Sequence, residues 1–372
     1  MPCIADIHEA ADLEALPGDV AALFATEADL AGGAGSTGCS LYATRAWYRV
    51  VVASALPPGA VACFVWVTLD GVPAALFPLL RLANGEIQSL TTPYSCEYVP
   101  LLAADLTPDA LLRVFGAFGQ WCRSRPALRL EALAPEWPGL AVLQQGLRAA
   151  GLSVLSFRHF GKWYEPTAGV TWAQYLAGRD GALRETVRRR VARSARDPGI
   201  RFALLRRQDD VEVGIAAFET VYAKSWKQPE PYPSFNATLI RTASALGILR
   251  LAVMWRQEVA VAVQYWIVSG GRASMLKLAH DEAFKLLSPG TVLTAWVIES
   301  LLEREAITEI DFGRGDDPYK RAWTRQRRQR IGLLLANPRS FAGLVLIGRH
   351  RLGVAGRRLQ MALQSVVKRC VA

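Results

Sequence analysis

Apolar and polar residues along the chain show the same order of patterns twice. In the first half, apolar runs over 62–69 and 72–80 flank Asp70-Gly71, a pair that favours a tight hairpin turn. The pattern after this hairpin predicts a strand at 86–90, a helix at 108–123, a strand at 128–133, a helix at 140–150 and a strand at 153–157.

The second half opens with a basic helical region over 171–196 and then repeats the order of hairpin, third strand, helix and strand. Its predicted elements are a strand at 200–205, helices at 209–226 and 235–246, a hairpin of 249–255 and 259–268, a strand at 274–279, a helix at 292–305 and a strand at 309–312. Two such units predict an α/β (α+β) fold, each unit with a mixed, mostly antiparallel sheet flanked by helices.

Changes of pattern divide the chain into four segments. We expect a helical lead-in over 1–41, a first unit over 42–166 and a second unit over 167–338. From 339 to 372, basic residues alternate with Leu, Val and Met at helical spacing, which predicts a basic amphipathic helix.

Composition and charge limit the possible partners. The chain has 372 residues, of which 51% are hydrophobic, and a formal net charge of +10. This length suits two domains, and the positive charge favours anionic partners such as CoA, nucleotides, anionic polymers, nucleic acid or a membrane surface. The arginines cluster at 184–207, 314–330 and 349–369.

The six cysteines are scattered and form no Cys-x-x-Cys pair, so we expect reduced thiols and no metal site. The acidic start of the sequence does not resemble a signal peptide, and no uncharged apolar run approaches the roughly 20 residues needed to span a bilayer. The predicted location is cytoplasmic, with possible peripheral contact between the C-terminal helix and the inner face of the membrane.

The stretch Ser288-Pro289-Gly290-Thr291 precedes the predicted helix 292–305. The first N–H groups of a helix have no partner within the helix, so this end is a ready site for a phosphate or diphosphate. The alternative is an ordinary strand-to-helix turn in which Ser288 is the N-cap residue.

The hairpin, Ser288-Pro289-Gly290, the following helix, Ile310-Asp311-Phe312-Gly313 and Tyr319-Lys320 together resemble the GNAT-fold acyltransferases, and more narrowly their FemAB-like and CelD-like (cellulose-biosynthesis-associated) acetyltransferase branch. The resemblance is best over 171–338 and weaker over 42–166, where tandem members carry a degenerate unit. Of the usual Gln/Arg-x-x-Gly-x-Gly/Ala loop this chain keeps only Gly290.

The resemblance implies an acyl-CoA donor, normally acetyl-CoA, whose diphosphate lies at the start of the helix. The implied cofactor-binding residues are Lys285, Ser288, Pro289, Gly290, Thr291 and Lys320. A solvated lysine or a loop-stabilising ion pair is the alternative for the two lysines. The reaction requires no metal.

Tyr319 corresponds to the tyrosine that protonates the leaving thiolate in many GNAT enzymes, a role that suits a phenol because its pKa is near that of a thiol. Candidates for the base that deprotonates the acceptor are His280, Asp281 and Asp311, with Asp316 or Asp317 as further choices. A surface Tyr319, a structural His280 and an Asp311 that only holds its loop are the alternatives.

Aromatic and charged residues of the second unit predict an acceptor pocket. Trp226 and Lys227 end a predicted helix, Tyr232 lies in the Pro-rich loop after it, and Asp316 follows the last predicted strand. Aromatic faces with a lysine suit a sugar or nucleotide-sugar acceptor, whereas aromatics that merely cover the core are the alternative.

The resemblance implies an acyl-CoA-dependent N-acyltransferase that acts on an amine or hydroxyl of a cell-envelope or polysaccharide-related acceptor. An aminoacyl-tRNA donor, as in FemAB-type transferases, is one alternative. The others are a degenerate scaffold that has lost transfer and a non-catalytic module that binds nucleic acid or a membrane surface. No nucleic-acid-binding signature is present in the sequence, so specific nucleic-acid binding is not expected.

Overall fold

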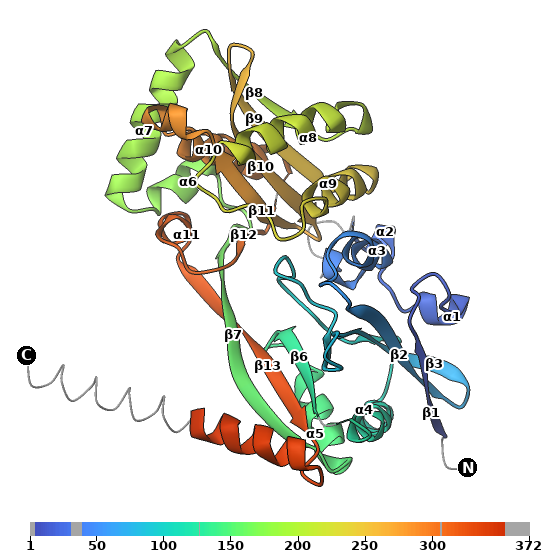
Figure 1. Ribbon diagram of the computed structural model, residues 1–372. Coiled ribbons are helices and arrows are strands. Elements are labelled where there is room, and N and C mark those ends of the chain that lie inside the picture. Colours follow the sequence, from blue (N-terminus) through green and yellow to red (C-terminus); the bar gives the residue numbers. More distant parts are fainter. Residues whose placement is uncertain (1–3, 31–38, 126, 306, 354–372) are drawn as a thin grey trace, which may run out of the picture.

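One continuous sheet runs through the whole computed structural model (Figure 1). The structure describes residues 4–30, 39–125, 127–305 and 307–353. Within these ranges, no helix is both long and apolar enough to span a bilayer.

The elements of the first half are β1 (Ala5–Ala10), α1 (Gly18–Ala21), α2 (Glu27–Leu30), η1 (Leu41–Ala43), α3 (Arg45–Ser54), β2 (Val61–Leu69), β3 (Val72–Arg81), β4 (Ile87–Ser89), β5 (Leu101–Leu102), α4 (Pro108–Arg123), β6 (Ala127–Leu133), α5 (Leu140–Ala149) and β7 (Ser153–Pro166).

The elements of the second half are α6 (Trp172–Ala177), α7 (Gly181–Arg196), β8 (Ile200–Leu205), α8 (Gln208–Ala223), α9 (Phe235–Ala245), β9 (Leu249–Arg256), β10 (Val259–Ser269), β11 (Arg272–His280), η2 (Glu282–Leu287), α10 (Pro289–Glu305), β12 (Glu309–Arg314), α11 (Pro318–Trp323) and β13 (Gln326–Ala336). Residues 341–353 are also helical.

The two halves have the same strand pairing, which confirms the predicted fold class. In the first half β2 and β3 form an antiparallel hairpin, β3 pairs with β4, and β4 lies parallel to β6. In the second half β9 and β10 form the hairpin, β10 pairs with β11, and β11 lies parallel to β12. A helix, α4 or α10, forms the crossover between the two parallel strands in each half.

The two units are joined by the long antiparallel pair of β7 and β13. The strand order is β1-β2-β3-β4-β6-β13-β7-β12-β11-β10-β9-β8, so this pair lies at the centre of the sheet. The last residues of β13 pair with β6 of the first unit, whereas the last residues of β7 pair with β12 of the second (Figure 1). The relative position of the units is therefore set by backbone hydrogen bonds.

Some parts of the chain differ from the predictions made from the sequence. The lead-in begins with a strand, since β1 pairs with β2 along the edge of the sheet, so the prediction of a helical lead-in is wrong for these residues. Strand β13 was not predicted, because its first five residues, 326–330, are all polar or charged. Most of the C-terminal basic region, 354–372, lies outside the described residues.

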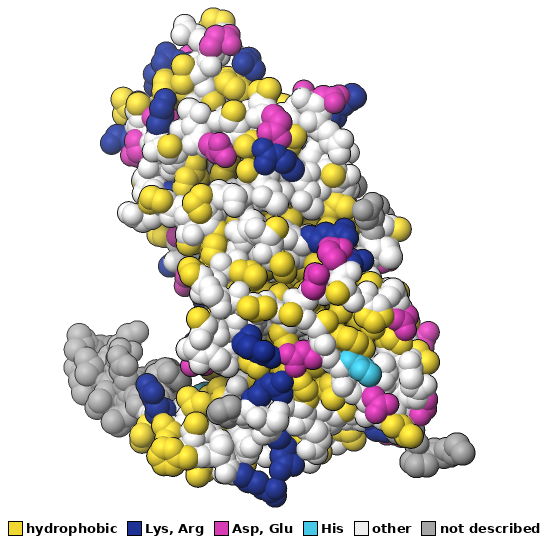
Figure 2. All heavy atoms as spheres, turned by 45° about the vertical axis from the view of Figure 1, so that its right-hand side comes forward, with side chains coloured by type: hydrophobic (Ala, Val, Ile, Leu, Met, Phe, Trp, Pro, Cys, Tyr) yellow, Lys and Arg dark blue, Asp and Glu magenta, His cyan; other side chains and the backbone are white. Residues whose placement is uncertain are grey.

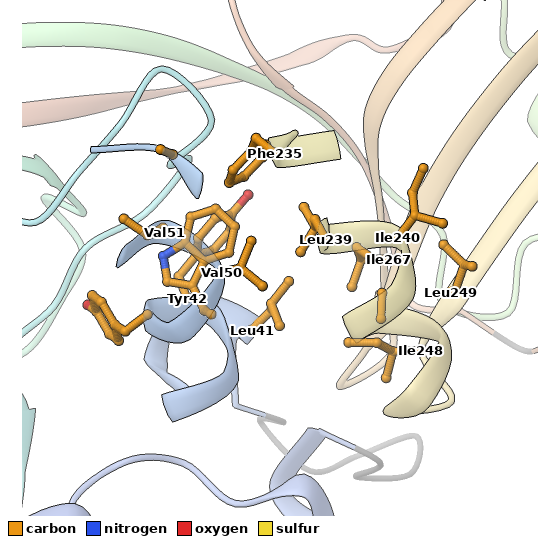
Figure 3. Close-up of a cluster of buried hydrophobic side chains, with 14 of the residues drawn as sticks. Leu41, Tyr42, Val50, Val51, Phe235, Leu239, Ile240, Ile248, Leu249 and Ile267 are labelled. Carbon is orange, nitrogen blue, oxygen red and sulfur yellow. The ribbon is translucent and has the colours of Figure 1, made fainter. Parts of the chain in front are cut away.

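Successive residues of a strand point to opposite faces of the sheet, and the helices cover both faces. In β9, Leu251 and Val253 pack against α8 and α9, whereas Ala252 and Met254 pack against α10. The first of these cores continues into the first unit. Figure 3 shows Tyr42 and Val50 of that unit close to Phe235 of the second. The shared core adds a second, apolar joint between the units.

A buried ion pair lies at the point where β11 and β12 separate. These strands pair only from Arg272 to Ser274, opposite Glu309 to Asp311. The Asp311 carboxylate lies 2.6 Å from Lys162 Nζ of β7, and both side chains are only 1% exposed. It also accepts a 2.8 Å hydrogen bond from the N–H of Gly313, which has a left-handed φ of 67°. Asp311 therefore stabilises the irregularity that turns β12 away from β11.

We predict that Asp311→Asn destabilises the protein by roughly 3–5 kcal/mol, because it leaves the Lys162 ammonium buried without a counter-ion. Denaturant unfolding measures the effect. Arg241→Met, which removes an exposed pair with Glu212, is the control and should cost less than about 1 kcal/mol. Equal losses in the two variants would contradict the structural role of the buried pair.

The same pair predicts a dependence on pH. Burial opposes ionisation of Asp311, but the Lys162 ammonium outweighs it and leaves the pKa of this carboxyl below its ordinary value. The stabilisation is therefore present above the unfolded pKa of about 3.9 and is lost as the pH falls through the lowered folded pKa. The acid limb of the stability curve should be shallower in Asp311→Asn than in the wild type.

Candidate active site

A cavity of about 570 Å³ opens where β11 and β12 diverge. Its walls come from β11, β12, η2 and the first turns of α10 and α11, and from the start of the segment after α8. The lining residues are Trp226, Lys227, Met275, Leu276, Lys277, Leu278, His280, Lys285, Ser288, Gly290, Thr291, Phe312, Asp317, Pro318, Tyr319 and Lys320. Ten of the predicted site residues are thus brought together: Trp226, Lys227, His280, Lys285, Ser288, Gly290, Thr291, Asp317, Tyr319 and Lys320.

The first turn of α10 forms one wall of this cavity. Ser288 has a left-handed φ of 54°, and its carbonyl accepts the N–H of Val292 at 3.1 Å. Pro289 has no N–H, so the N–H groups of Gly290 and Thr291 are the free donors of this end. A helix N-terminus that opens onto a cavity favours an anion.

The corresponding helix of the first unit is closed to such a ligand. The side chain of Thr107 caps α4 by accepting the N–H of Ala110 at 3.2 Å, and Asp109 lies in the first turn. A capped end beside a carboxylate repels a diphosphate. Of these two equivalent helices, α10 is therefore the one whose first turn is open to an anion.

A buried polar network holds the start of α10 against β10. The Trp266 indole donates to the Gln264 side-chain oxygen at 3.0 Å, and the Gln264 amide donates to the Thr294 hydroxyl at 2.5 Å and to the Gly290 carbonyl at 3.3 Å. Gln264 and Thr294 are fully buried. A buried polar atom without a hydrogen-bond partner is energetically unfavourable. The network therefore fixes the position of the start of α10 relative to β10.

Tyr319 completes this network and lines the cavity. Its hydroxyl lies 2.5 Å from the Thr294 hydroxyl and donates to the Gly290 carbonyl at 3.3 Å. Since Gln264 already donates to Thr294, the Thr294 proton is free to point to Tyr319. Burial raises the pKa of Tyr319, so this phenol is protonated at neutral pH.

Three lysines meet where this cavity joins a second one of about 210 Å³. Lys227, Lys277 and Lys320 line both cavities. Burial, together with the Lys277 charge, lowers the pKa of Lys227, and burial lowers that of Lys320. Among the described residues, no carboxylate lies within salt-bridge distance of Lys227, and the nearest to Lys320 is Asp317 at 3.8 Å.

Of the three lysines, Glu230 neutralises the charge of Lys277 only. Its carboxylate is paired with the Lys277 ammonium and accepts hydrogen bonds from Tyr94 at 2.7 Å and Tyr222 at 2.5 Å. Burial raises the pKa of Glu230, but these hydrogen bonds outweigh burial and leave it lowered. The sequence analysis assigned no role to Glu230 or Lys277, because the contact joins residues 47 positions apart.

The second cavity lies between the two units. The first unit contributes Pro93, Tyr94 and Cys96, and the second contributes Phe235 and Arg314 among others. Arg314 donates to the carbonyls of Thr92 and Pro93, at 3.4 and 3.2 Å, and so fixes the loop that forms this wall.

A third cavity, of about 240 Å³, shares Pro93 and Arg314 with the second. It lies where β4 and β6 of the first unit diverge, which is the position equivalent to the main cavity. His159 accepts the N–H of Ala132 on Nδ1 at 3.0 Å, which leaves Nε2 to carry the proton and point toward Glu131, 3.7 Å away. No role was predicted from the sequence for Glu131 or His159 of this cavity.

The structure places the other predicted site residues outside the main cavity. Asp281 caps η2 by accepting the N–H of Ala283, and Asp311 is held by the buried ion pair. Asp316 is exposed beside Arg321 and Arg327. Tyr232 lines the third cavity. Pro289 is buried within the first turn of α10.

Two candidate bases line the main cavity: Asp317, which caps α11 by accepting the N–H of Lys320, and His280. The His280 ring lies against Trp226, with centroids 4.5 Å apart, and Nε2 is 3.2 Å from Glu282. Burial lowers the pKa of His280 despite Glu282, so the imidazole is neutral at pH 7 and can accept a proton.

Comparison with known proteins agrees with this geometry. Residues 181–321 match the family model described as an acetyltransferase (GNAT) domain. The chain is a GNAT-fold transferase. No curated protein is a significant match to the sequence.

Several solved structures resemble the chain at low identity. The structure of FemX is 10% identical, with 80% of this chain and 92% of that chain covered and a TM-score of 0.54. A tandem GNAT protein from the clavulanic acid biosynthesis pathway is 13% identical (91% and 100% covered, TM-score 0.48). The C-terminal domain of a putative lysylphosphatidylglycerol synthetase from Agrobacterium fabrum is 14% identical (74% and 84% covered, TM-score 0.47).

The buried network of this GNAT-fold transferase predicts a specific stability effect. Thr294→Val removes the hydroxyl between Gln264 and Tyr319 and should cost about 1–3 kcal/mol in denaturant unfolding. Thr220→Val is the control, since the Thr220 hydroxyl also bonds its own helix, at Ala216 O, but is exposed. A loss in Thr294→Val no larger than in Thr220→Val would show that the network does not hold α10.

Proposed function

We propose that this enzyme is an acyl-CoA-dependent N-acyltransferase, with acetyl-CoA as the donor, acting on an amine or hydroxyl of a cell-envelope or polysaccharide-related acceptor. The observation that carries the proposal is the free N-terminus of α10 at the wall of the cavity between β11 and β12. The proposed place of action is the cytoplasm, at the inner face of the membrane.

The donor is assigned to the main cavity. Its diphosphate would accept hydrogen bonds from the N–H groups of Gly290 and Thr291, with Lys285 as a nearby cation. The acyl end would then reach toward Met275 and Phe312, where the strands separate. A volume of about 570 Å³ falls within the ordinary range of small-molecule sites, about 300–1,000 Å³.

Acyl transfer then needs one proton removed and one supplied. The acceptor nitrogen or oxygen attacks the thioester carbonyl carbon and loses its proton, which we assign to neutral His280, directly or through a water. The carbon–sulfur bond breaks as the tetrahedral intermediate collapses, and Tyr319 gives a proton to the leaving thiolate. Burial raises the pKa of Tyr319 above that of a thiol, so the phenol keeps its proton at neutral pH and releases it only to the thiolate charge that forms beside it.

The acceptor is assigned to the second and third cavities. Lys227 and Lys320 lie at the junction with little compensation by carboxylates, and an ammonium out of water is unfavourable without a counter-charge. An acceptor with a carboxylate or phosphate would supply that charge. The polar walls around Glu131, His159 and Arg314 suit hydroxyl or amino groups farther along the same molecule.

An aminoacyl-tRNA donor is the second candidate. One observation favours it, because the basic helix α7 lies beside the cavity mouth, where Arg190 donates to the Leu286 carbonyl of η2 at 2.9 Å. A row of arginines at this mouth suits a polyphosphate backbone. Binding of tRNA that falls steeply with salt, together with no affinity for CoA, would select this donor.

The sharpest test of the donor site is Gly290→Asp. A Cβ at Gly290 would meet only His280 Nδ1 and Leu278 Cδ1, at 3.5 and 3.6 Å, so it fits. A carboxylate in the first turn favours the helix but repels a diphosphate, so acetyl-CoA affinity should fall at least tenfold while the melting temperature is kept. Gly290→Ala, the matched control, should keep most of the affinity. Equal acetyl-CoA affinity in both variants would place the diphosphate elsewhere.

The role of Tyr319 is tested by Tyr319→Phe. Removal of a general acid should lower the rate of acyl transfer by about 10²–10⁴ while acetyl-CoA affinity changes little. Transfer is followed as release of free CoA thiol with a panel of amino sugars and hydroxylated acceptors. A rate unchanged by this substitution would assign the proton to water or to another group.

A further inference from the structure

The helix at 341–353 has an apolar stripe that faces away from the protein. Gly343 and Ile347 are buried against the rest of the chain. The stripe consists of Phe341, Leu344, Val345 and Leu352, with exposed fractions of 84%, 54%, 43% and 74%. Apolar side chains gather at the lower edge of the molecule in Figure 2, beside the large grey group.

The spacing places this stripe on one side of the helix. At about 100° per residue, positions 341, 344, 345 and 352 fall within one sector, and Gly343 and Ile347 fall on the opposite side. Arg349 and Arg351 fall on the two flanks of the stripe. Apolar residues bordered by arginines form the surface of a helix that lies in a bilayer interface, where the arginines reach the headgroups.

The charge of this region indicates what covers the stripe. From residue 337 to the end the sequence contains no Asp or Glu, and its seven basic residues are Arg339, Arg349, Arg351, Arg357, Arg358, Lys368 and Arg369. A segment with this net charge is complementary to anionic lipid headgroups, and Arg339, Arg349 and Arg351 lie within the described residues. An apolar partner alone would gain nothing from seven cations.

The stripe does not compete with the active site for space. Strand β13 leads from α11, at the main cavity, to the helix at 341–353 (Figure 1). Its 11 residues span roughly 36 Å at about 3.3 Å per residue. A membrane bound at the stripe therefore leaves the cavities open.

We propose that the apolar stripe of Phe341, Leu344, Val345 and Leu352, with its flanking arginines, docks the enzyme on an anionic bilayer. The helix lies in the plane of the interface, inserts the apolar stripe and places the arginines among phosphate headgroups. The proposal is independent of the acyl donor, since none of these residues lines the three cavities described above.

Sedimentation with vesicles tests the proposal on the full chain. The probes are vesicles of phosphatidylcholine and of an equal mixture with phosphatidylglycerol. The wild type should bind the mixed vesicles at least tenfold more tightly than the neutral ones, and high salt should weaken that binding. Wild-type protein that stays in the supernatant with both would overturn the proposal.

Two variants separate the apolar and charged contributions. Phe341→Asp/Leu344→Asp should lower binding to mixed vesicles at least tenfold, and Arg349→Gln/Arg351→Gln, which leaves five of the seven cations, should weaken the preference for anionic lipid. Val213→Asp is the matched control, because Val213 is 59% exposed on α8 and should be neutral for binding. An equal loss in the control would overturn the proposal.

A rival occupant of the stripe has its own signature. If two copies cover it, analytical ultracentrifugation should show a dimer that Phe341→Asp/Leu344→Asp abolishes, with no vesicle binding in any variant, and the bilayer proposal is then wrong. Because every substituted side chain is exposed, melting temperatures should stay unchanged. Acetyl-CoA affinity should also be the same in all these variants.

Discussion

The buried ion pair between Lys162 and Asp311 is the contact on which the active site depends. It lies at the last rung of the β11–β12 ladder, and Lys162 comes from β7, the strand that passes through both units. The same carboxylate holds the Gly313 N–H, so one side chain stabilises both the ladder and the irregularity that ends it. Without that irregularity β12 would continue beside β11 and the cavity would close.

The two units contribute different features to the candidate site. Their strand pairing is equivalent, but only α10 offers free N–H groups, whereas Thr107 caps the equivalent helix of the first unit. The first unit contributes its diverging strands and the loop around Tyr94 to the walls of the second and third cavities. This division requires a fixed relative position, which the β7–β13 pair and the shared core both supply.

Local signals in the sequence were enough to predict most elements and the main cavity. The hairpin at Asp70-Gly71 has left-handed φ values at both positions, 50° and 80°, as its turn signal requires, and the start of α10 lies where Pro289 indicates. Residues from 285 to 291 and Tyr319-Lys320 lie on neighbouring segments of one unit. Their proximity therefore follows from the order of strand, helix and strand.

Contacts between distant segments could not be predicted in this way. Strand β13 was missed because its arginines read as an anion-binding cluster, whereas Arg328 and Arg330 are paired with Glu309 and Glu136 across the sheet. In the sequence, Gln264 is a single polar residue within an apolar strand. Its role could not be predicted, because it depends on how closely α10 packs against β10. The choice of His280 over Asp281 and Asp311 required burial and pairing, which sequence spacing does not contain.

Calorimetric titration of the full chain with acetyl-CoA, CoA and ATP tests the central claim most directly. The free N-terminus of α10 predicts micromolar binding of acetyl-CoA and CoA, well above that of ATP. ATP shares the adenosine and a 5′-polyphosphate with CoA but lacks the 3′-phosphate and the pantetheine arm that would reach between β11 and β12. Absence of acetyl-CoA and CoA binding, or ATP affinity equal to theirs, would contradict the assignment of the cavity as an acyl-CoA site.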